Sequence, residues 1–260
     1  MNTNILSILD IQHEINDIIK RAIQFKTEYA TNQLKPYLEG KMLSLLFERP
    51  STRTRISFEV GMHHLGGNSI FLTQKEIKLG TRESAEDIAL VLSRYVDIIM
   101  YRPIQKEHLH ALAQHATVPV INGLDQDEHP CQILADLMTI KEHKKTCKNQ
   151  HFIFIGDGDD NLTHSYLLGC PLVGMDITVI SPKKYWPQTQ YLKKAQQLAA
   201  QNNVQVNITE DLSAITTGDI ITTDTWISWW YEQERSQRLQ DLSPYTITQE
   251  LMKQAKKDAV

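Results

Sequence analysis

Residues 47–55 read Phe47-Glu48-Arg49-Pro50-Ser51-Thr52-Arg53-Thr54-Arg55, and this stretch decides the fold of the first half of the chain. The apolar run 42–47 that leads into it predicts a short buried strand. After it, Ile56 and Val60 recur at helical spacing, so we expect a helix to begin near Ser51. A strand that turns directly into a helix is the building unit of α/β proteins.

The same stretch predicts a binding site for an oxyanion. A helix start presents backbone N–H groups without partners and the positive end of the helix dipole. Ser51, Thr52 and Thr54 add hydroxyl donors, and Arg53 can clamp phosphate oxygens. The alternative is a capped helix with a solvated basic first turn, but cations there oppose the dipole unless an anion compensates them. We therefore expect a phosphate-type ligand.

Composition and charge narrow the class of protein. The chain has 260 residues, with 41% hydrophobic and 22% charged side chains, which is ordinary for a globular protein of one large or two modest domains. A net charge of −4 gives no reason to expect nucleic acid as a partner. We expect no signal peptide and no membrane span, and the 3 scattered cysteines fit a reducing cytoplasm.

Apolar runs alternate with amphipathic stretches along the whole chain, which is the pattern of an α/β protein with parallel sheets. Strands are expected at 42–47, 69–72, 97–102, 118–121, 151–156, 177–181, 204–208 and 219–223. Helices are expected from about 51, at 84–95, 107–115, 130–143 and 188–202. The polar run 141–150 is a hinge candidate, so the sequence predicts two open parallel-sheet domains, 1–145 and 150–260, with flanking helices and an interdomain active-site cleft.

Two further segments place polar side chains at expected strand ends in the first half. Arg102 ends a strand, where it can reach an electron-rich oxygen, although a surface arginine is the alternative interpretation. His129, Pro130, Cys131 and Gln132 open a helix, with the proline where a missing N–H is tolerated. A helix-capping histidine is the alternative there.

In the second half, residues 154–161 read Phe-Ile-Gly-Asp-Gly-Asp-Asp-Asn between a strand and a helix. A dinucleotide-binding loop is one interpretation, but the glycine pattern is incomplete and the aspartates would repel a pyrophosphate. An acidic loop suits a ligand with an ammonium group better. Asp224 and Ser228 add a carboxylate and a hydroxyl after another strand, although a lone aspartate there is usually a turn or cap residue.

Three motifs occur together in order: residues 47–55, Tyr-Arg at 101–102, and His-Pro-Cys-Gln-Ile-Leu-Ala-Asp at 129–136. With them the chain resembles the aspartate/ornithine carbamoyltransferase family, from about Ile5 to Val260. His-Pro-Cys-Gln together with Asp224 and Ser228 is similar to the ornithine branch of that family.

The resemblance implies transfer of the carbamoyl group of carbamoyl phosphate to the δ-amine of ornithine, giving citrulline and phosphate, by a cytoplasmic homotrimer without metal or cofactor that serves arginine biosynthesis. It assigns Arg102 and His129 to catalysis. It assigns carbamoyl phosphate binding to ten residues: Ser51, Thr52, Arg53, Thr54, Lys78, Arg102, His129, Pro130, Cys131 and Gln132. It assigns ornithine binding to Asn161, Asp224, Ser228 and Trp229.

The chain departs from the family pattern in four places. Family members continue into a His-Cys-Leu-Pro motif and a last helix, so we expect this chain to be truncated at its C-terminus. The family's Ser-Met-Gly is Ser228-Trp229-Trp230, and Lys78 stands where bacterial relatives usually carry a glutamine. The loop before Asn161 is one residue longer, which leaves open whether Asp160 or Asn161 meets ornithine.

These departures leave two hypotheses. The first is an active ornithine-type carbamoyltransferase. The second is a non-catalytic or inactive truncated relative that binds carbamoyl phosphate, because the first half carries its motifs in full and the second half does not. A citrulline assay distinguishes the two. A dinucleotide-binding dehydrogenase is a distant third.

Overall fold

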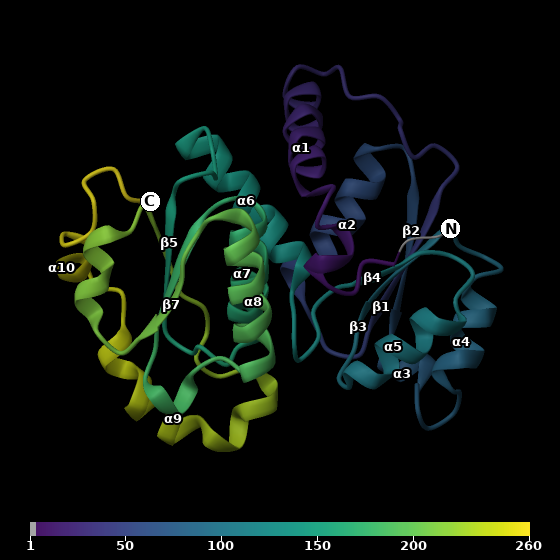
Figure 1. Cartoon of the computed structure of the whole chain (residues 1–260). Coiled ribbons are helices and arrows are strands. Elements are labelled where there is room, and N and C mark those ends of the chain that lie inside the picture. The colour runs from purple at the N-terminus through teal and green to yellow at the C-terminus, as the bar shows by residue number, and fades with distance from the viewer. Residues whose placement is uncertain (1–3) are drawn as a thin grey trace. The chain divides into compact units, whose positions relative to one another are not determined.

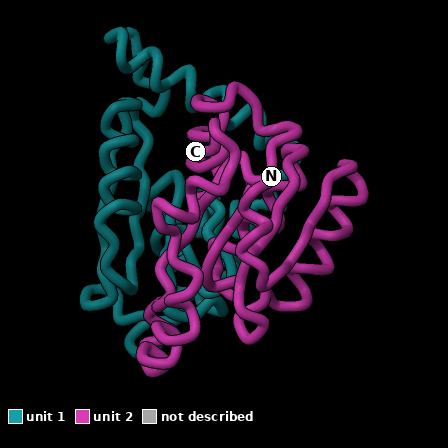
Figure 2. The backbone as a smooth tube through the Cα atoms, turned by 90° about the vertical axis from the view of Figure 1, so that its left-hand side faces the viewer, with its two compact units in different colours: residues 1–131 teal, residues 132–260 magenta. Residues whose placement is uncertain are grey.

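The computed structural model describes residues 4–260 (Figure 1). The chain forms two compact units, which divide after Cys131 and are coloured separately in Figure 2. We describe each unit by itself. Within the described residues, no helix has both the length and the apolar character that crossing a membrane requires.

The first unit is built on a sheet of four parallel strands in the order β2-β1-β3-β4. The strands are β1 (Met42–Phe47), β2 (Asn68–Thr73), β3 (Ile98–Arg102) and β4 (Val120–Asn122). β1 is buried from Leu43 to Phe47, because it has a neighbouring strand on each side and side chains packed on both faces. Parallel sheets covered on both faces have this continuous apolar character.

Helices cover both faces of this sheet. They are η1 (Ile8–Ile11), α1 (Ile15–Ala30), α2 (Thr52–His64), α3 (Gln74–Ile77), α4 (Ala85–Leu92) and α5 (Lys106–His115). On one face Ile88 of α4 and Leu109 of α5 pack in a cluster with Ile99. On the other face Met62 of α2 packs with Leu45 and Met100. The strand-to-helix turns therefore emerge at the carboxyl edge of a firmly packed sheet.

The second unit repeats the design with parallel strands in the order β7-β6-β5-β8. They are β5 (His151–Ile155), β6 (Asp176–Ile180), β7 (Val206–Thr209) and β8 (Ile220–Thr222). Its helices are α6 (Pro130–Lys144, which begins in the first unit), α7 (Asn161–Leu172), α8 (Thr189–Asn202), α9 (Arg235–Leu242) and α10 (Gln249–Met252). Short 3-10 turns join them: η2 (Lys183–Tyr185), η3 (Leu212–Thr217), η4 (Trp229–Glu234) and η5 (Ser243–Tyr245). α7 is buried along nearly its whole length, which matches its apolar sequence.

The predicted α/β class with two parallel sheets and flanking helices is confirmed. All eight expected strands exist, and the bounds of β1 agree with the prediction. The strand expected at 118–121 begins instead at Val120, because Pro119 before it has no N–H for the ladder. The helices α1 and α9 were not predicted. α9 has few apolar residues, whereas in α1 the apolar residues Ile15, Ile19 and Ile23 do recur at helical spacing, so α1 was missed although its pattern is helical.

Candidate active site

Arg102, at the end of β3, lies against the turn that follows β1. The register pairs Phe47 with Arg102, so the two strands end side by side. From there Arg102 Nη1 donates to Thr54 Oγ1 at 3.1 Å and lies 3.4 Å from Ser51 Oγ. The arginine is only 8% exposed. The structure therefore brings the Tyr-Arg motif at 101–102 into contact with the motif at 47–55.

The positive charge of Arg102 is destabilised by its surroundings. Burial and, to a smaller extent, the nearby positive charge of Arg53 together lower the pKa of Arg102 to about 10. Arg102 is still cationic at neutral pH, because its pKa lies well above 7. Two arginines so close together repel each other, and a bound anion would relieve that repulsion.

The start of α2 completes this polar group. Ser51 is the N-cap residue, in an extended conformation with a φ of −152°, yet its hydroxyl makes no capping hydrogen bond. No acidic residue lies in the first turn, so the helix dipole has no anionic partner there. Thr52 and Arg53 are exposed beside it. The free N–H groups, the hydroxyls and the arginines fit an oxyanion such as phosphate.

Arg55, the last arginine of the motif, has a different role. Its Nε donates to Glu59 at 3.0 Å, one turn along the helix. Its guanidinium also lies 3.7 Å from the centre of the Phe71 ring. Arg55 therefore anchors α2 to β2 and is not part of the group around Arg102.

The loop after β4 approaches Arg102 from another side. The carbonyl of Gly123 lies 3.5 Å from Arg102 Nη1. A Cβ at position 123 would lie 2.3 Å from Met100 Sδ, so any larger residue there would have to displace the buried Met100 side chain. The next residue, Leu124, has a φ of +113°, a strained conformation for a branched side chain. Asn122 stabilises it by accepting the Leu124 N–H at 2.9 Å.

Two buried carboxyl groups shape the turn that leads to His129. Asp125 Oδ1 accepts the N–H groups of Asp127 and Glu128, both at 2.8 Å. Glu128 in turn accepts the N–H of Ile8 at 3.2 Å. Burial raises the pKa of Glu128 to about 8. This side chain ties the loop to the N-terminal turn η1.

His129 is a neutral imidazole at physiological pH. Burial lowers its pKa to about 3, and the positive charge of Arg102 adds to the effect. A neutral histidine can donate one hydrogen bond to an oxygen, but it cannot serve as an imidazolium acid near pH 7. The structure thus brings His129 within electrostatic range of Arg102, as the sequence motif suggested.

The remaining predicted residues of the first unit differ in their surroundings. Pro130 is the first residue of α6, and Cys131 Sγ lies 3.6 Å from the carbonyl of Asn122, to which it donates. Burial raises the pKa of the Cys131 thiol to about 12, so it remains protonated. Lys78 lies apart, exposed, with a φ of +48° after α3, and its carbonyl accepts the N–H groups of Thr81 and Arg82.

In the second unit, the acidic loop after β5 is largely buried. Asp157 forms an ion pair with Arg238, and each of these side chains is 3% exposed. Asp160 is the N-cap of α7 and accepts the Leu162 N–H at 2.9 Å. Burial and, to a smaller extent, the negative charge of Asp224 raise the pKa of Asp160 to about 8. Asn161 is the first residue of α7 and is also buried.

The segment after β8 contributes the other predicted residues. Asp224 is exposed, and its charge acts on Asp160 and on Asp136. Ser228 precedes η4, and its Oγ is buried without a hydrogen-bond partner among residues 4–260. Trp229 is 39% exposed, with its ring 5.6 Å from that of Trp230. A carboxylate and an unsatisfied hydroxyl within one short segment suit a ligand that carries ammonium and carboxylate groups.

Arg238 of α9 holds this segment in place, and no sequence motif pointed to this residue. Its Nη1 lies 3.4 Å from the Trp226 carbonyl and also contacts Asp157. Its Nε donates to Glu234 at 3.0 Å, and its guanidinium lies 3.8 Å from the centre of the Tyr231 ring. One buried cation therefore joins the loop after β5 to the segment after β8.

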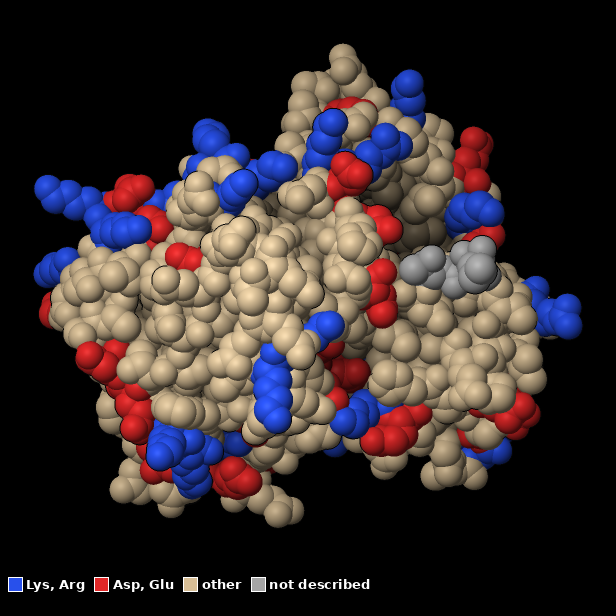
Figure 3. Space-filling view, viewed as in Figure 1, with Lys and Arg blue, Asp and Glu red and all other residues tan. Residues whose placement is uncertain are grey.

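Within residues 4–260, the visible charges form no second basic cluster on the face drawn in Figure 3. On the face seen in Figure 3, basic and acidic side chains are interspersed. No group of three or more His, Cys, Asp or Glu side chains among the described residues could hold a metal ion. The basic cluster around Arg102 is thus a local feature.

Comparison with known proteins gives matches along nearly the whole chain. The family model described as aspartate/ornithine carbamoyltransferase, carbamoyl-P binding domain, matches residues 3–142. The model described as the Asp/Orn binding domain of the same family matches residues 148–260. The two models together leave only a short segment within α6 and the turn after it unmatched.

Relatives with these names are similar in sequence and structure. Ornithine carbamoyltransferase of Methanobrevibacter smithii is 42% identical over 259 residues, which are 99% of this chain and 85% of that protein. The catabolic ornithine carbamoyltransferase of Thermoplasma volcanium is 40% identical over 260 residues, covering 99% of this chain and 84% of the relative. The crystallised enzyme of Pyrococcus furiosus has a TM-score of 0.95 at 39% identity, over 100% of this chain and 83% of its own.

Proposed function

The chain belongs to the aspartate/ornithine carbamoyltransferase family, and on that premise we propose that it transfers the carbamoyl group of carbamoyl phosphate to the δ-amine of ornithine. It is a transferase, and its relatives at about 40% identity are named ornithine carbamoyltransferase. The observation that carries this assignment is the match of both domain models within one chain. A carbamoyl-phosphate half and an amino-acid half are both present.

The first unit supplies the groups for the phosphate. Ser51, Thr52, Arg53 and Thr54 offer hydroxyls, a guanidinium and helix N–H groups to its oxygens. The close approach of Arg102 and Arg53 supports this role, because a dianion would offset their repulsion. We assign Lys78 to the same anion as a mobile point charge, and Pro130 and Cys131 to the backbone that carries His129.

The reaction follows from where charge develops. The neutral δ-amine attacks the carbonyl carbon of carbamoyl phosphate, the new C–N bond forms, and the carbonyl oxygen gains negative charge. Arg102, Thr54 and neutral His129 donate hydrogen bonds to that oxygen, an effect that is commonly the largest in acyl transfer. The C–O bond to phosphate then breaks, the amine loses a proton, and citrulline and phosphate result.

The second unit supplies the groups for ornithine. We propose that the Asp224 carboxylate binds the α-ammonium group, and that Ser228 donates its unsatisfied hydroxyl to the substrate. Asn161, buried at the start of α7, and Trp229 border the same ligand. Asp160 caps α7 through its own carboxylate, which favours Asn161 over Asp160 as the residue that meets ornithine.

We further propose a homotrimer that works in the cytoplasm and serves arginine biosynthesis. The anabolic name of a Campylobacter jejuni relative, with a TM-score of 0.93, supports the biosynthetic direction. The catabolic name of the Thermoplasma volcanium relative defines the competing direction. Sedimentation velocity measures the oligomer, and the ratio of forward to reverse rates at fixed substrate concentrations measures the preferred direction.

A citrulline assay tests the function. Purified protein is incubated with carbamoyl phosphate and ornithine, and citrulline and phosphate are measured together. Equal amounts of both products are expected. Aspartate in place of ornithine is the specificity control and should give no carbamoylated product. Phosphate release without citrulline, or tight binding of carbamoyl phosphate without turnover, would instead support the non-catalytic relative.

A further inference from the structure

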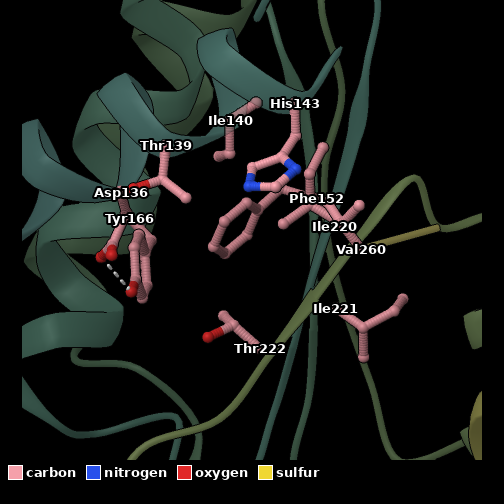
Figure 4. A pocket seen from close by; sticks show the side chains of 10 residues that line it. All are labelled: Asp136, Thr139, Ile140, His143, Phe152, Tyr166, Ile220, Ile221, Thr222 and Val260. Atoms are coloured by element: carbon pink, nitrogen blue, oxygen red, sulfur yellow. Dashed lines mark hydrogen bonds between the residues drawn. The ribbon is translucent and has the colours of Figure 1, made fainter.

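A chain of three polar side chains in the second unit ends at Gln132. Tyr166 Oη donates to Asp136 Oδ2 at 2.6 Å, and Figure 4 shows these two side chains pointing toward one another from α7 and α6. Gln132 Nε2 donates to the other carboxylate oxygen, Asp136 Oδ1, at 3.1 Å. Asp136 and Tyr166 lie in the wall of a pocket of about 200 Å³.

The carboxylate decides which way the glutamine amide faces. An ionised carboxylate only accepts hydrogen bonds, so the amide must turn its NH₂ group toward Asp136. The Gln132 carbonyl oxygen Oε1 then faces away from Asp136. Burial raises the pKa of Asp136, whereas the hydrogen bonds from Tyr166 and Gln132 lower it and favour the ionised form.

We propose that Asp136, held by Tyr166, is a positioning residue that fixes the amide of Gln132 with Oε1 toward the carbamoyl NH₂ group of the substrate. This inference rests on the proposed function, which gives Gln132 the carbamoyl nitrogen as its partner. A carbonyl oxygen accepts the N–H of the carbamoyl group, whereas a flipped amide would oppose it with its own N–H. The Tyr166–Asp136–Gln132 chain therefore selects a carbamoyl group over an acyl group of the same shape.

The competing interpretation is an ordinary helix pair. Gln132 and Asp136 are four residues apart on α6, and such pairs stabilise helices slightly wherever they occur. The chain offers a matched control for this interpretation on α9. There Asp241 accepts hydrogen bonds from Tyr185 Oη at 2.8 Å and from Gln237 Nε2 at 2.7 Å, in the same i, i+4 arrangement.

Two stable ligands separate the interpretations. Phosphonoacetamide keeps the amide of carbamoyl phosphate, and acetonylphosphonate replaces its NH₂ with a methyl group. Calorimetry on the full chain measures the dissociation constant of each. We expect Asp136→Asn to weaken phosphonoacetamide about tenfold, the order expected for one lost hydrogen bond with an opposed donor. Acetonylphosphonate should bind as before, and Asp241→Asn should change neither constant.

Tyr166→Phe is the second variant, in case Asp136→Asn does not fold. This substitution removes the hydrogen bond from Tyr166 to Asp136 and leaves that carboxylate less firmly held. We therefore expect the preference for phosphonoacetamide over acetonylphosphonate to fall about two- to threefold, which is less than the loss of a whole hydrogen bond. Equal weakening of both ligands, or an unchanged preference in the folded variants, would overturn the proposal. A wild type without preference for the amide would overturn it as well. Failure of the proposed function is seen separately, as the absence of citrulline from the wild type.

Discussion

The guanidinium of Arg102 and the hydroxyl of Thr54 lie 3.1 Å apart, and this hydrogen bond joins the end of β3 to the first turn of α2. It forms although the arginine is buried and repelled by Arg53. The groups that we propose for oxyanion binding in the first unit are thus held in position by protein contacts. Such preorganised donors stabilise a developing negative charge without rearranging during the reaction.

Arg102→Lys should lower kcat by a factor of about 100 to 1,000, the usual cost of removing one oxyanion donor. A lysine keeps the charge but loses the planar fork that reaches Thr54 and Ser51 together. Steady-state citrulline formation measures the effect. Arg21→Lys, an exposed substitution on α1, is the matched control and should leave the rate unchanged. Similar rates for both variants would remove Arg102 from the proposed catalysis.

Glu128 predicts how stability depends on pH. Its pKa is about 8 in the folded chain against an ordinary 4.5. Between these values the unfolded chain loses this proton while the folded chain retains it, so the folded state binds more protons. Stability contributed by Glu128 therefore falls as the pH rises, by up to about 1.4 kcal/mol per pH unit.

Urea unfolding of Glu128→Gln at about pH 5 and about pH 8 measures this slope. The variant should lose less stability than the wild type as the pH rises, because glutamine keeps the acceptor for Ile8 without a titrating proton. Glu39→Gln, at an exposed position, is the control and should behave like the wild type. Parallel curves for the wild type and Glu128→Gln would contradict the raised pKa.

Ser228→Ala separates a binding role from a structural one. The Ser228 hydroxyl is buried without a partner, so its removal should leave the melting temperature unchanged or slightly higher. If the hydroxyl donates to ornithine, KM for ornithine should rise about tenfold, as expected for a hydrogen bond to a charged group. Ser236→Ala on exposed α9 is the control. A lower melting temperature with an unchanged KM would mean that Ser228 is structural.

Arg238→Ala should destabilise the second unit by about 3–5 kcal/mol, because it leaves the buried Asp157 carboxylate without its cation. Chemical unfolding, followed by tryptophan fluorescence, measures the loss. Arg235→Ala, also on α9, removes a surface ion pair with Glu232 of η4 and should unfold close to the wild type. Equal effects of the two substitutions would show that the Asp157–Arg238 pair contributes little.

The sequence predicted most directly the strands that are largely apolar. β1 is apolar except for the buried Ser44, and its limits agree with the prediction. α9 reads Arg-Ser-Gln-Arg-Leu-Gln-Asp-Leu, and one of its two buried residues is Arg238. A pattern of apolar residues cannot reveal a helix that is anchored by a buried charge.

The contacts of the candidate site also differ in how far the sequence could predict them. Contacts such as Arg102 to Thr54 could be anticipated, because adjacent parallel strands bring their carboxyl ends together. Asp136 was visible only as the last letter of a motif, and its partner Tyr166 is 30 residues away on another helix. That pairing depends on how α6 and α7 pack, which no local pattern encodes.

The contacts of Arg238 have a consequence for protein engineering. The Arg238 guanidinium contacts both the carbonyl of Trp226 and the ring of Tyr231. Replacing residues 224–230 with those of a relative would therefore require replacing α9 as well. A chimera that exchanges the loop alone would leave a cation facing a mismatched surface. Under the proposed ornithine-binding role of this segment, an exchange of substrate preference would therefore need residues 224–242 together with the aspartate at 157.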